Sequence, residues 1–143
     1  MPKVTVLLTS YNHEEFIADS IESILNQTYT DFELYIVDDC SMDNSWEVIQ
    51  KYNDPRIIAI HHEKNMFGCS NREFYKNFKG QYFAMAHCDD LWELDKLEKQ
   101  VKYLDEHPEV GACFSWVQLI DDYGNNYDNP DHPYSKVFLE ENM

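Results

Sequence analysis

Residues 32–39 read Phe-Glu-Leu-Tyr-Ile-Val-Asp-Asp, an apolar run that ends abruptly on two carboxylates. Apolar, β-branched and aromatic side chains bounded by polar ones are typical of a buried strand. A second run of this kind, residues 82–88, ends on Asp89 and Asp90. In an open α/β sheet, ligands bind just outside the carboxyl ends of the strands. We therefore expect a ligand site where the two acidic pairs meet.

Strand-like and helix-like segments alternate along the rest of the chain. Apolar runs predict strands at residues 4–8, 32–37, 57–60, 82–86 and 110–117, and the segments between them have helical spacing or helix-capping residues. Such alternation indicates an α/β fold, with a mainly parallel sheet flanked by helices and right-handed crossovers. The pattern changes after Asp121, so we expect one domain over residues 1–120 and a separate region or tail over residues 121–143.

Composition narrows the class of protein. The chain has 143 residues, 43% of them hydrophobic, which is enough for one domain with its own core. The net charge of −16 argues against nucleic acid as a partner and against an anionic membrane surface as the main anchor. No signal peptide or membrane span is visible, and the four cysteines form no CxxC pair. These features favour a cytoplasmic protein.

The first acidic pair can recognise a nucleotide base. A carboxylate at Asp38 or Asp39 can accept an N–H from uracil, a directional contact in a partly dry crevice. The alternative is that one of them caps the following helix, although Ser41 and Asp43 are better placed for capping. A pair of aspartates before those residues is redundant for capping alone.

The second acidic pair can bind a metal. Adjacent carboxylates repel each other unless a cation joins them, and carboxylate oxygens suit Mg²⁺ or Mn²⁺. Two solvated acids in a turn are the alternative interpretation. His87 and Cys88 raise the question of zinc, but a structural zinc site needs four clustered ligands, so we rank zinc below Mg²⁺ or Mn²⁺.

Three other side chains are candidates for a ligand site, each with an equally plain structural role. Arg72 has the donor geometry for a diphosphate, or it is a surface charge on a short helix. Trp92 and Trp116 can stack on a sugar, although core packing is the better default for a tryptophan. The sequence has no G-x-G-x-x-G after the first strand, no P-loop and no G-x-S-x-G, so dinucleotide, P-loop and hydrolase functions lack support.

At these residues the chain resembles a family 2 glycosyltransferase with the GT-A nucleotide-sugar fold. The resemblance covers essentially the whole chain, and it is specific because several motifs occur together in order. The matching stretches are residues 4–12, 23–29, 32–41, 79–92 and 111–122. The family often has Asp at the position of His87, and Arg-Asn where this chain has Asn71-Arg72.

The resemblance implies roles for individual residues. The uracil end of a UDP-sugar would be held by Thr9, Tyr11 and Asp39. Arg72 would reach the diphosphate, and His87 and Cys88 would lie near the ribose and diphosphate. Asp89 would be the metal-binding acid of a DxD-type motif, with Asp90 beside it and Mn²⁺ or Mg²⁺ as the cofactor. The resemblance supplies no match for the catalytic base, which is expected beyond residue 143, together with the acceptor half.

The implied activity is inverting transfer of a sugar, a hexosyl or N-acetylhexosaminyl group, from a UDP-sugar to an acceptor hydroxyl. The acceptor would be a carbohydrate or a lipid-linked one in polysaccharide biosynthesis, at the inner face of the membrane. The sequence leaves two questions undecided: whether the protein forms a homo-oligomer, and whether the fragment by itself is active. The alternative is a non-catalytic nucleotide-sugar-binding or assembly module with a degenerate GT-A fold. A nucleotidyltransferase would need a basic, glycine-rich loop after the first strand, and residues 7–11 offer none.

Overall fold

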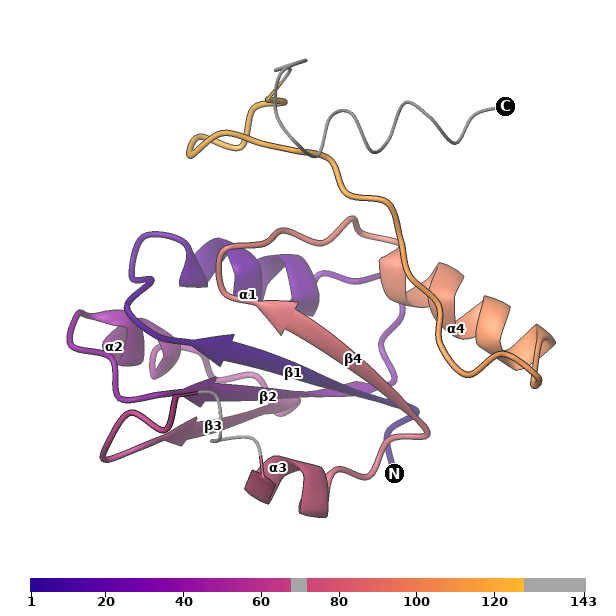
Figure 1. Cartoon of the computed structure of the whole chain (residues 1–143), viewed down its shortest axis with the longest axis horizontal. Helices are drawn as coiled ribbons and strands as arrows, with labels where there is room; N and C mark the ends of the chain where they lie inside the picture. The colour runs from indigo at the N-terminus through magenta and orange to yellow at the C-terminus, as the bar shows by residue number, and fades with distance from the viewer. Residues whose placement is uncertain (68–71, 128–143) are drawn as a thin grey trace. The chain divides into compact units, whose positions relative to one another are not determined.

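The computed structural model describes residues 1–67 and 72–127, without the side chains of residues 72 and 73. Its elements follow the alternation that the sequence predicts (Figure 1). They are β1 (Val4–Ser10), α1 (Ile17–Leu25), β2 (Phe32–Asp38), α2 (Ser45–Ile49), β3 (Ile57–His61), α3 (Arg72–Asn77), β4 (Tyr82–His87) and α4 (Lys96–Glu106). No helix within the described ranges is both long and apolar enough to cross a bilayer.

The four strands form one parallel sheet in the order β3-β2-β1-β4, which confirms the predicted α/β class. The chain first winds outward from β1 to β3 and then returns to the other side of β1 to add β4. In register, Ser10 of β1 lies opposite Asp38 of β2, and Thr9 lies opposite His87 of β4. The two strands that lead into the acidic pairs are thus the two neighbours of β1.

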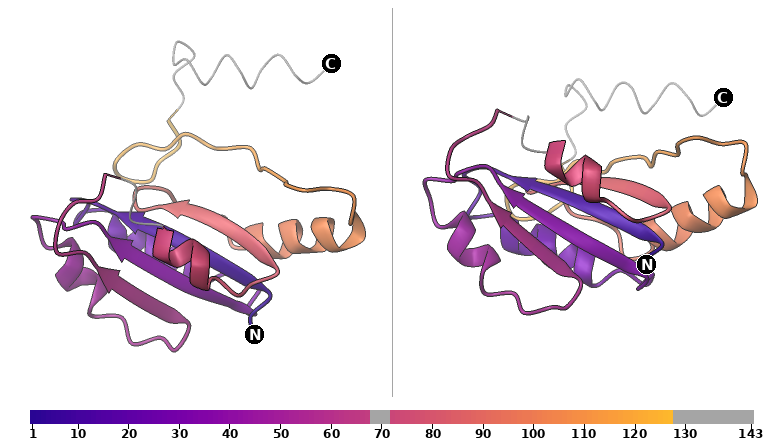
Figure 2. Two further views of the ribbon diagram at one scale, coloured as in Figure 1. Left: turned by 60° about the horizontal axis from the view of Figure 1, so that its bottom comes forward. Right: turned by 90° about the horizontal axis from the view of Figure 1, so that it is seen from below.

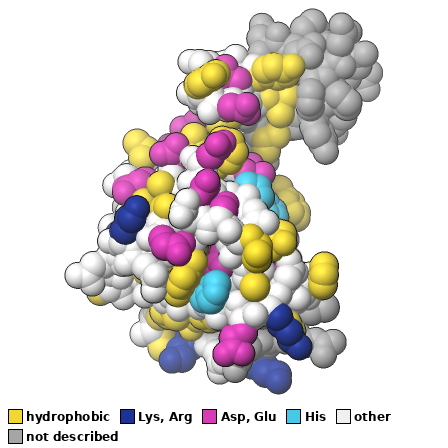
Figure 3. Space-filling view, turned by 90° about the vertical axis from the view of Figure 1, so that its left-hand side faces the viewer, with side chains coloured by type: hydrophobic (Ala, Val, Ile, Leu, Met, Phe, Trp, Pro, Cys, Tyr) yellow, Lys and Arg dark blue, Asp and Glu magenta, His cyan; other side chains and the backbone are white. Residues whose placement is uncertain are grey.

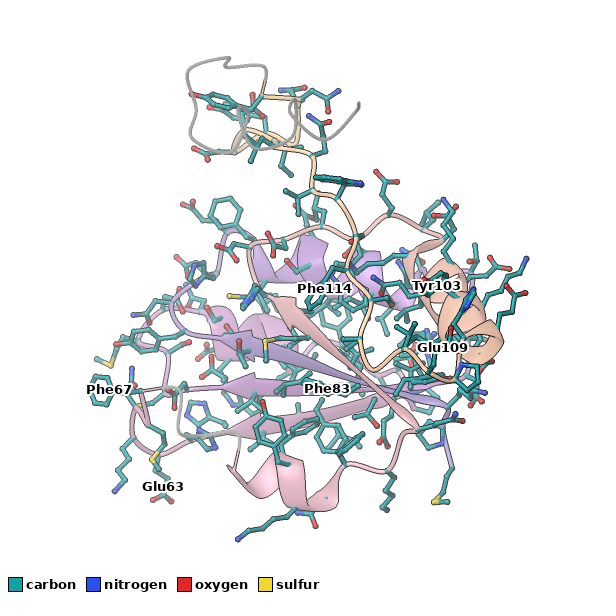
Figure 4. The ribbon with its side chains drawn as sticks, turned by 45° about the vertical axis from the view of Figure 1, so that its right-hand side comes forward. Glu63, Phe67, Phe83, Tyr103, Glu109 and Phe114 are labelled. Atoms are coloured by element: carbon teal, nitrogen blue, oxygen red, sulfur yellow. The ribbon has the colours of Figure 1, made fainter. Side chains whose placement is uncertain are left out.

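Helices cover the two faces of the sheet unequally (Figures 1 and 2). On one face, α1, α2 and α4 pack on the alternate residues Val4, Val6 and Leu8 of β1 and on their neighbours in β2. On the other face, α3 places Phe74 against Leu7 and Tyr35. Phe83 of β4 lies on this α3 side, with its ring centroid 5.7 Å from that of Phe74 (Figure 4). The core therefore lies mainly between the sheet and α1, α2 and α4.

A close approach of backbone to backbone brings β4 alongside β1. The Gly80 N–H donates to Thr5 Oγ1 at 2.9 Å, just before β4 begins. A Cβ atom at Gly80 would lie 2.5 Å from the Thr5 nitrogen, closer than real side chains come. Glycine is required here for proximity to the neighbouring strand, as in other sheets where two backbones meet closely.

The predicted strand at residues 110–117 is wrong. The structure assigns no strand to this segment, and Phe114 and Trp116 are 93% and 66% exposed. An apolar run becomes a strand only when a neighbouring strand pairs with its backbone groups, and no described strand lies beside this one. The chain divides into two compact units between Cys113 and Phe114, so the division falls within the predicted strand.

Candidate functional site

The candidate site lies at the edge of the sheet where the strands end. Because β1 separates β2 from β4, the carboxyl ends of those two strands are about 10 Å apart, or two strand spacings. The winding direction reverses between β1 and β4, and this reversal is where open α/β sheets bind ligands. Figure 3 views the end of the molecule toward which the strand arrows of Figure 1 point, and acidic side chains are spread across it. The structure thus places both acidic pairs at one edge.

Asp38 is buried and fully engaged with its own protein. Its side chain is 0% exposed. The Ser41 hydroxyl donates to one carboxylate oxygen, and the Ser41 N–H donates to the other at 3.0 Å. His61 Nδ1 lies 2.9 Å from that second oxygen, and the His61 ring stacks on Trp46. The role of Asp38 is therefore to tie the ends of β2 and β3 together.

Asp39 is engaged through only one of its two oxygens. His62 Nδ1 lies 3.1 Å from Asp39 Oδ1, and the Met66 N–H donates to the same oxygen at 2.8 Å. None of the described residues donates to Asp39 Oδ2. The side chain is 14% exposed, which leaves this oxygen an acceptor in a partly dry setting. Of the first acidic pair, Asp39 is the member that can accept a hydrogen bond from a ligand.

The loops after β1 and β2 are joined to each other. Asn12 Oδ1 accepts the Met42 N–H at 2.7 Å, and the Asn12 N–H donates to Ser41 Oγ at 2.9 Å. Asn12 and Cys40 both have positive φ, 56° and 65°, a conformation that is costly for cysteine and that clusters at functional sites. The Asn12 side chain thus fixes the shape of the ligand-facing edge.

Strand alternation separates His87 from Cys88. Cys88 is 5% exposed and packs in the core on the α1 side, whereas His87 is exposed at the end of β4. Burial raises the pKa of the Cys88 thiol, and the Tyr11 backbone and the Ser10 hydroxyl beside it partly oppose this rise. Of these two residues, only His87 is accessible to a ligand.

Asp89 and Asp90 are exposed in the turn after β4. His13 Nδ1 lies 2.8 Å from the Tyr11 carbonyl oxygen, and His13 Nε2 lies 3.9 Å from Asp89 Oδ2, too far for a hydrogen bond. Across residues 1–67 and 72–127, no three histidine, cysteine or acidic side chains come close enough to hold a metal ion. Any cation at this turn would need ligands from water or a bound substrate besides these carboxylates.

Polar side chains of α1 and of the turn after it hold the segment that carries Asp90. Ser20 Oγ donates to the Asp90 carbonyl oxygen at 2.9 Å, and Ser23 Oγ accepts the Trp92 N–H at 3.1 Å. Gln27 is 3% exposed; its Nε2 donates to the Glu93 carbonyl oxygen at 2.8 Å, and its Oε1 accepts the Leu97 N–H at 3.0 Å. This role of Gln27 was not predicted from the sequence. A buried glutamine just after an apolar helix face is the signal that points to it.

The remaining sequence candidates lie as follows. Tyr11 is 43% exposed in the loop after β1, and Thr9 is partly buried beside it. Trp92 is 9% exposed within the core, as the default for a tryptophan predicts, whereas Trp116 is exposed, against that default. Arg72 begins α3, and its side chain lies outside the described part of the structure.

Lys96 brings one cation close to the second acidic pair. Its ammonium lies 5.1 Å from the centroid of the Trp92 ring. Burial lowers the pKa of Lys96, and the nearby Asp90 carboxylate partly opposes that change. The turn after β4 is thus bounded by a half-buried cation on its α4 side.

Comparison with known proteins identifies the family. The family model described as "Glycosyl transferase family 2" matches residues 5–142. An uncharacterized glycosyltransferase of Methanocaldococcus jannaschii is 39% identical over 129 residues, which are 87% of this chain and 44% of that protein. In Escherichia coli, the UDP-Glc:alpha-D-GlcNAc-diphosphoundecaprenol beta-1,3-glucosyltransferase WfaP is 31% identical over 96% of this chain and 51% of its own length.

Solved structures agree on the fold. Residues 1–349 of TarS of Staphylococcus aureus, in complex with UDP-GlcNAc, superimpose with a TM-score of 0.69 at 27% identity, over 74% of this chain and 32% of the TarS 1–349 chain. A mannosyltransferase of Pyrobaculum calidifontis has a TM-score of 0.66 at 22% identity, over 72% of this chain and 32% of its own. The sheet with its flanking helices is the N-terminal part of a GT-A fold. The chain belongs to glycosyl transferase family 2, and it spans about half the length of the curated relatives it matches.

Proposed function

We propose that this chain supplies the donor-binding part of a glycosyltransferase that moves a sugar from a UDP-sugar to an acceptor hydroxyl. The observation that carries the proposal is the arrangement at the carboxyl edge of the sheet. Asp39, which follows β2, has an oxygen (Oδ2) that accepts from none of the described residues, and two exposed carboxylates, Asp89 and Asp90, follow β4. Membership of family 2 and the UDP-GlcNAc complex of TarS support a nucleotide-sugar ligand.

The base would lie at the β1–β2 side of the edge. Asp39 Oδ2 accepts the N3–H of uracil, and Tyr11 in the loop after β1 offers a half-exposed ring for stacking on the base. In the sheet register, Thr9 lies opposite Val37 of β2 on one side and His87 of β4 on the other. In this arrangement the ribose and diphosphate extend across β1 toward the end of β4, with His87 and Arg72 in their proposed roles.

A divalent cation suits the second acidic pair. Mg²⁺ and Mn²⁺ are commonly held by one or two carboxylates plus substrate phosphates and water, so Asp89 and Asp90 fit such an ion without a third protein ligand. When bound, the ion would neutralise charge on the leaving diphosphate. The protein's own contribution is to hold the turn in place through Ser20, Ser23 and Gln27.

The reaction itself would be an inverting displacement in which a general base deprotonates the acceptor hydroxyl. That base, and the surface that binds a carbohydrate or lipid-linked acceptor, belong to the part of the protein beyond residue 143 in this proposal. WfaP, which is named for a diphosphoundecaprenol-linked sugar, supports a lipid-linked acceptor.

A non-catalytic binding module is the second candidate. One observation favours it: His87 stands where the family often has Asp. Replacing His87 with Asp tests the proposed metal site. The substitution adds a carboxylate beside Asp89 and should leave Mn²⁺-dependent UDP binding equal or tighter.

Calorimetric titration of the 143-residue chain with UDP, with and without Mn²⁺, tests the donor-binding proposal. We expect heat of binding that grows with Mn²⁺, and a loss of the Mn²⁺-dependent part in Asp89→Ala. The matched control is Asp95→Ala, an exposed acid at the start of α4, which should leave the titration unchanged. No heat with the unaltered chain would overturn the proposal. Sugar transfer by the whole protein, assayed with UDP-glucose and UDP-GlcNAc, separates the transferase from the binding module.

A further inference from the structure

Asp38, the last residue of β2, and Asp39, which follows it, are each paired with a histidine at or just after the end of β3. His61 Nδ1 contacts Asp38, and His62 Nδ1 contacts Asp39, at 2.9 and 3.1 Å. The two pairs differ in how many carboxylate oxygens are already engaged in contacts within the protein. Both oxygens of Asp38 are engaged in a fully buried site, whereas Asp39 has both of its described donors on Oδ1. His62 therefore contacts a carboxylate whose other oxygen, Oδ2, can still accept a hydrogen bond from a ligand.

The chemistry of the contact fixes the direction of that acceptor. An ionised carboxylate only accepts hydrogen bonds, so the His62 ring contacts Asp39 through an Nδ1–H group. Together with the Met66 N–H, it supplies two donors to Oδ1. Two donors on one oxygen fix the rotation of the carboxylate group about its Cβ–Cγ bond. Oδ2 is then held in one direction, as an acceptor.

We propose that His62 is a positioning residue that orients Asp39 to select uracil over cytosine. The inference rests on the proposed function, because it takes Asp39 as the residue that contacts the base. Uracil presents N3–H, a donor that Asp39 Oδ2 can accept. Cytosine presents an unprotonated N3, whose lone pair faces the carboxylate and is repelled. Selectivity of this kind depends on where the acceptor points, and His62 controls that direction.

Two substitutions at His62 separate the hydrogen bond from the shape of the side chain. Both leucine and asparagine branch at Cγ as histidine does, and only asparagine carries a donor at the position of Nδ1. By titration with UDP and with CDP, we expect His62→Leu to weaken UDP binding about tenfold, the effect of losing one hydrogen bond to a charged group. CDP binding should change less, so the UDP:CDP affinity ratio falls. His62→Asn should restore the ratio to within about twofold of the original.

A polarity swap at Asp39 gives a second and sharper readout. In Asp39→Asn, the His62 and Met66 N–H groups still require an acceptor, so the amide oxygen takes the place of Oδ1 and the NH₂ group takes the place of Oδ2. The ligand-facing atom becomes a donor that suits cytosine N3. We expect this variant to prefer CDP over UDP. In Asp39→Asn combined with His62→Leu, one of the two orienting donors is gone and the preference for CDP should shrink.

His61→Leu is the matched control, because it removes the neighbouring histidine from a carboxylate that faces no ligand. It should lower the temperature of unfolding and leave the UDP:CDP ratio unchanged. The positioning role is overturned if His62→Leu leaves the UDP:CDP ratio unchanged, or if Asp39→Asn still prefers UDP. In either case, UDP binding by the unaltered chain would still support the proposed function. Absence of UDP binding by the unaltered chain overturns both. Where His62→Leu fails to fold, the Asp39→Asn comparison decides.

Discussion

Asp38 and His61, 23 residues apart in sequence, are joined by a contact of 2.9 Å between Oδ2 and Nδ1. The pair closes the carboxyl ends of β2 and β3, and the stacking of His61 on Trp46 extends the connection to α2. The adjacent residues Asp39 and His62 form a second pair, in which the aspartate side chain is 14% exposed whereas that of Asp38 is fully buried. Two pairs of the same composition thus serve different purposes, one in the core and one at the ligand-facing edge.

Replacing Asp38 with Asn should destabilise the protein. The buried carboxylate accepts from the Ser41 N–H, the Ser41 hydroxyl and His61, and an amide turns one of its two acceptor atoms into a donor. We expect the free energy of unfolding to fall by about 2–3 kcal/mol, the cost of a broken buried hydrogen bond to a charged group. Urea unfolding measures it. Asp39→Asn is the comparison, and an equal loss there would contradict the distinction between the two aspartates.

Replacing Gln27 with Leu should affect both stability and the acidic turn. The substitution leaves the Leu97 N–H and the Glu93 carbonyl without their partner in a buried site, at a cost of about 2–4 kcal/mol. Because the same segment carries Asp90, we also expect weaker Mn²⁺-dependent binding of UDP. Chemical unfolding and calorimetry measure the two effects. Gln50→Leu, on the exposed end of α2, should change neither.

Replacing Gly80 with Ala should separate β4 from β1. The added Cβ would lie 2.5 Å from the Thr5 nitrogen and 2.8 Å from the Tyr82 carbonyl oxygen, and both are backbone atoms. Overpacking of this kind costs about 1–3 kcal/mol, which thermal or urea unfolding detects. Gly111→Ala is the control, because its Cβ would have no neighbour within 4 Å. Equal stability of the two variants would show that the strands adjust freely at this point.

Stability should fall in acid partly through Asp54. The side-chain hydrogen bond from Arg56 holds the pKa of Asp54 below its usual 3.8, and burial opposes this only in part. A carboxyl whose pKa is depressed by folding stabilises the protein above the unfolded pKa, and this contribution is lost as the pH falls through the folded value. Asp54→Asn should therefore flatten the dependence of the urea midpoint on pH below about pH 4. An identical pH dependence in variant and unaltered protein would exclude Asp54 as a source.

Periodicity and strand-end chemistry predicted much of the fold and part of the site. The strands at residues 57–60 and 82–86 were predicted to within one residue at each end, because each is an apolar run bounded by polar residues or glycine. The same rule failed at residues 110–117, where apolar side chains are present but none of the described strands pairs with the segment. Pairing is a property of two segments, and one segment's composition does not contain it.

The sequence by itself determined the α/β class and the position of acids after β2 and β4, because hydrophobic period and strand ends are local properties. Only the tertiary structure decided which member of the first pair, Asp38 or Asp39, has an oxygen that accepts no hydrogen bond from the described residues. That outcome depends on His61, His62 and Ser41, which reach Asp38 and Asp39 only after β2 and β3 have paired. The donors that occupy a carboxylate come from segments distant in sequence. Packing, and not composition, therefore determines which acceptor oxygens remain for a ligand.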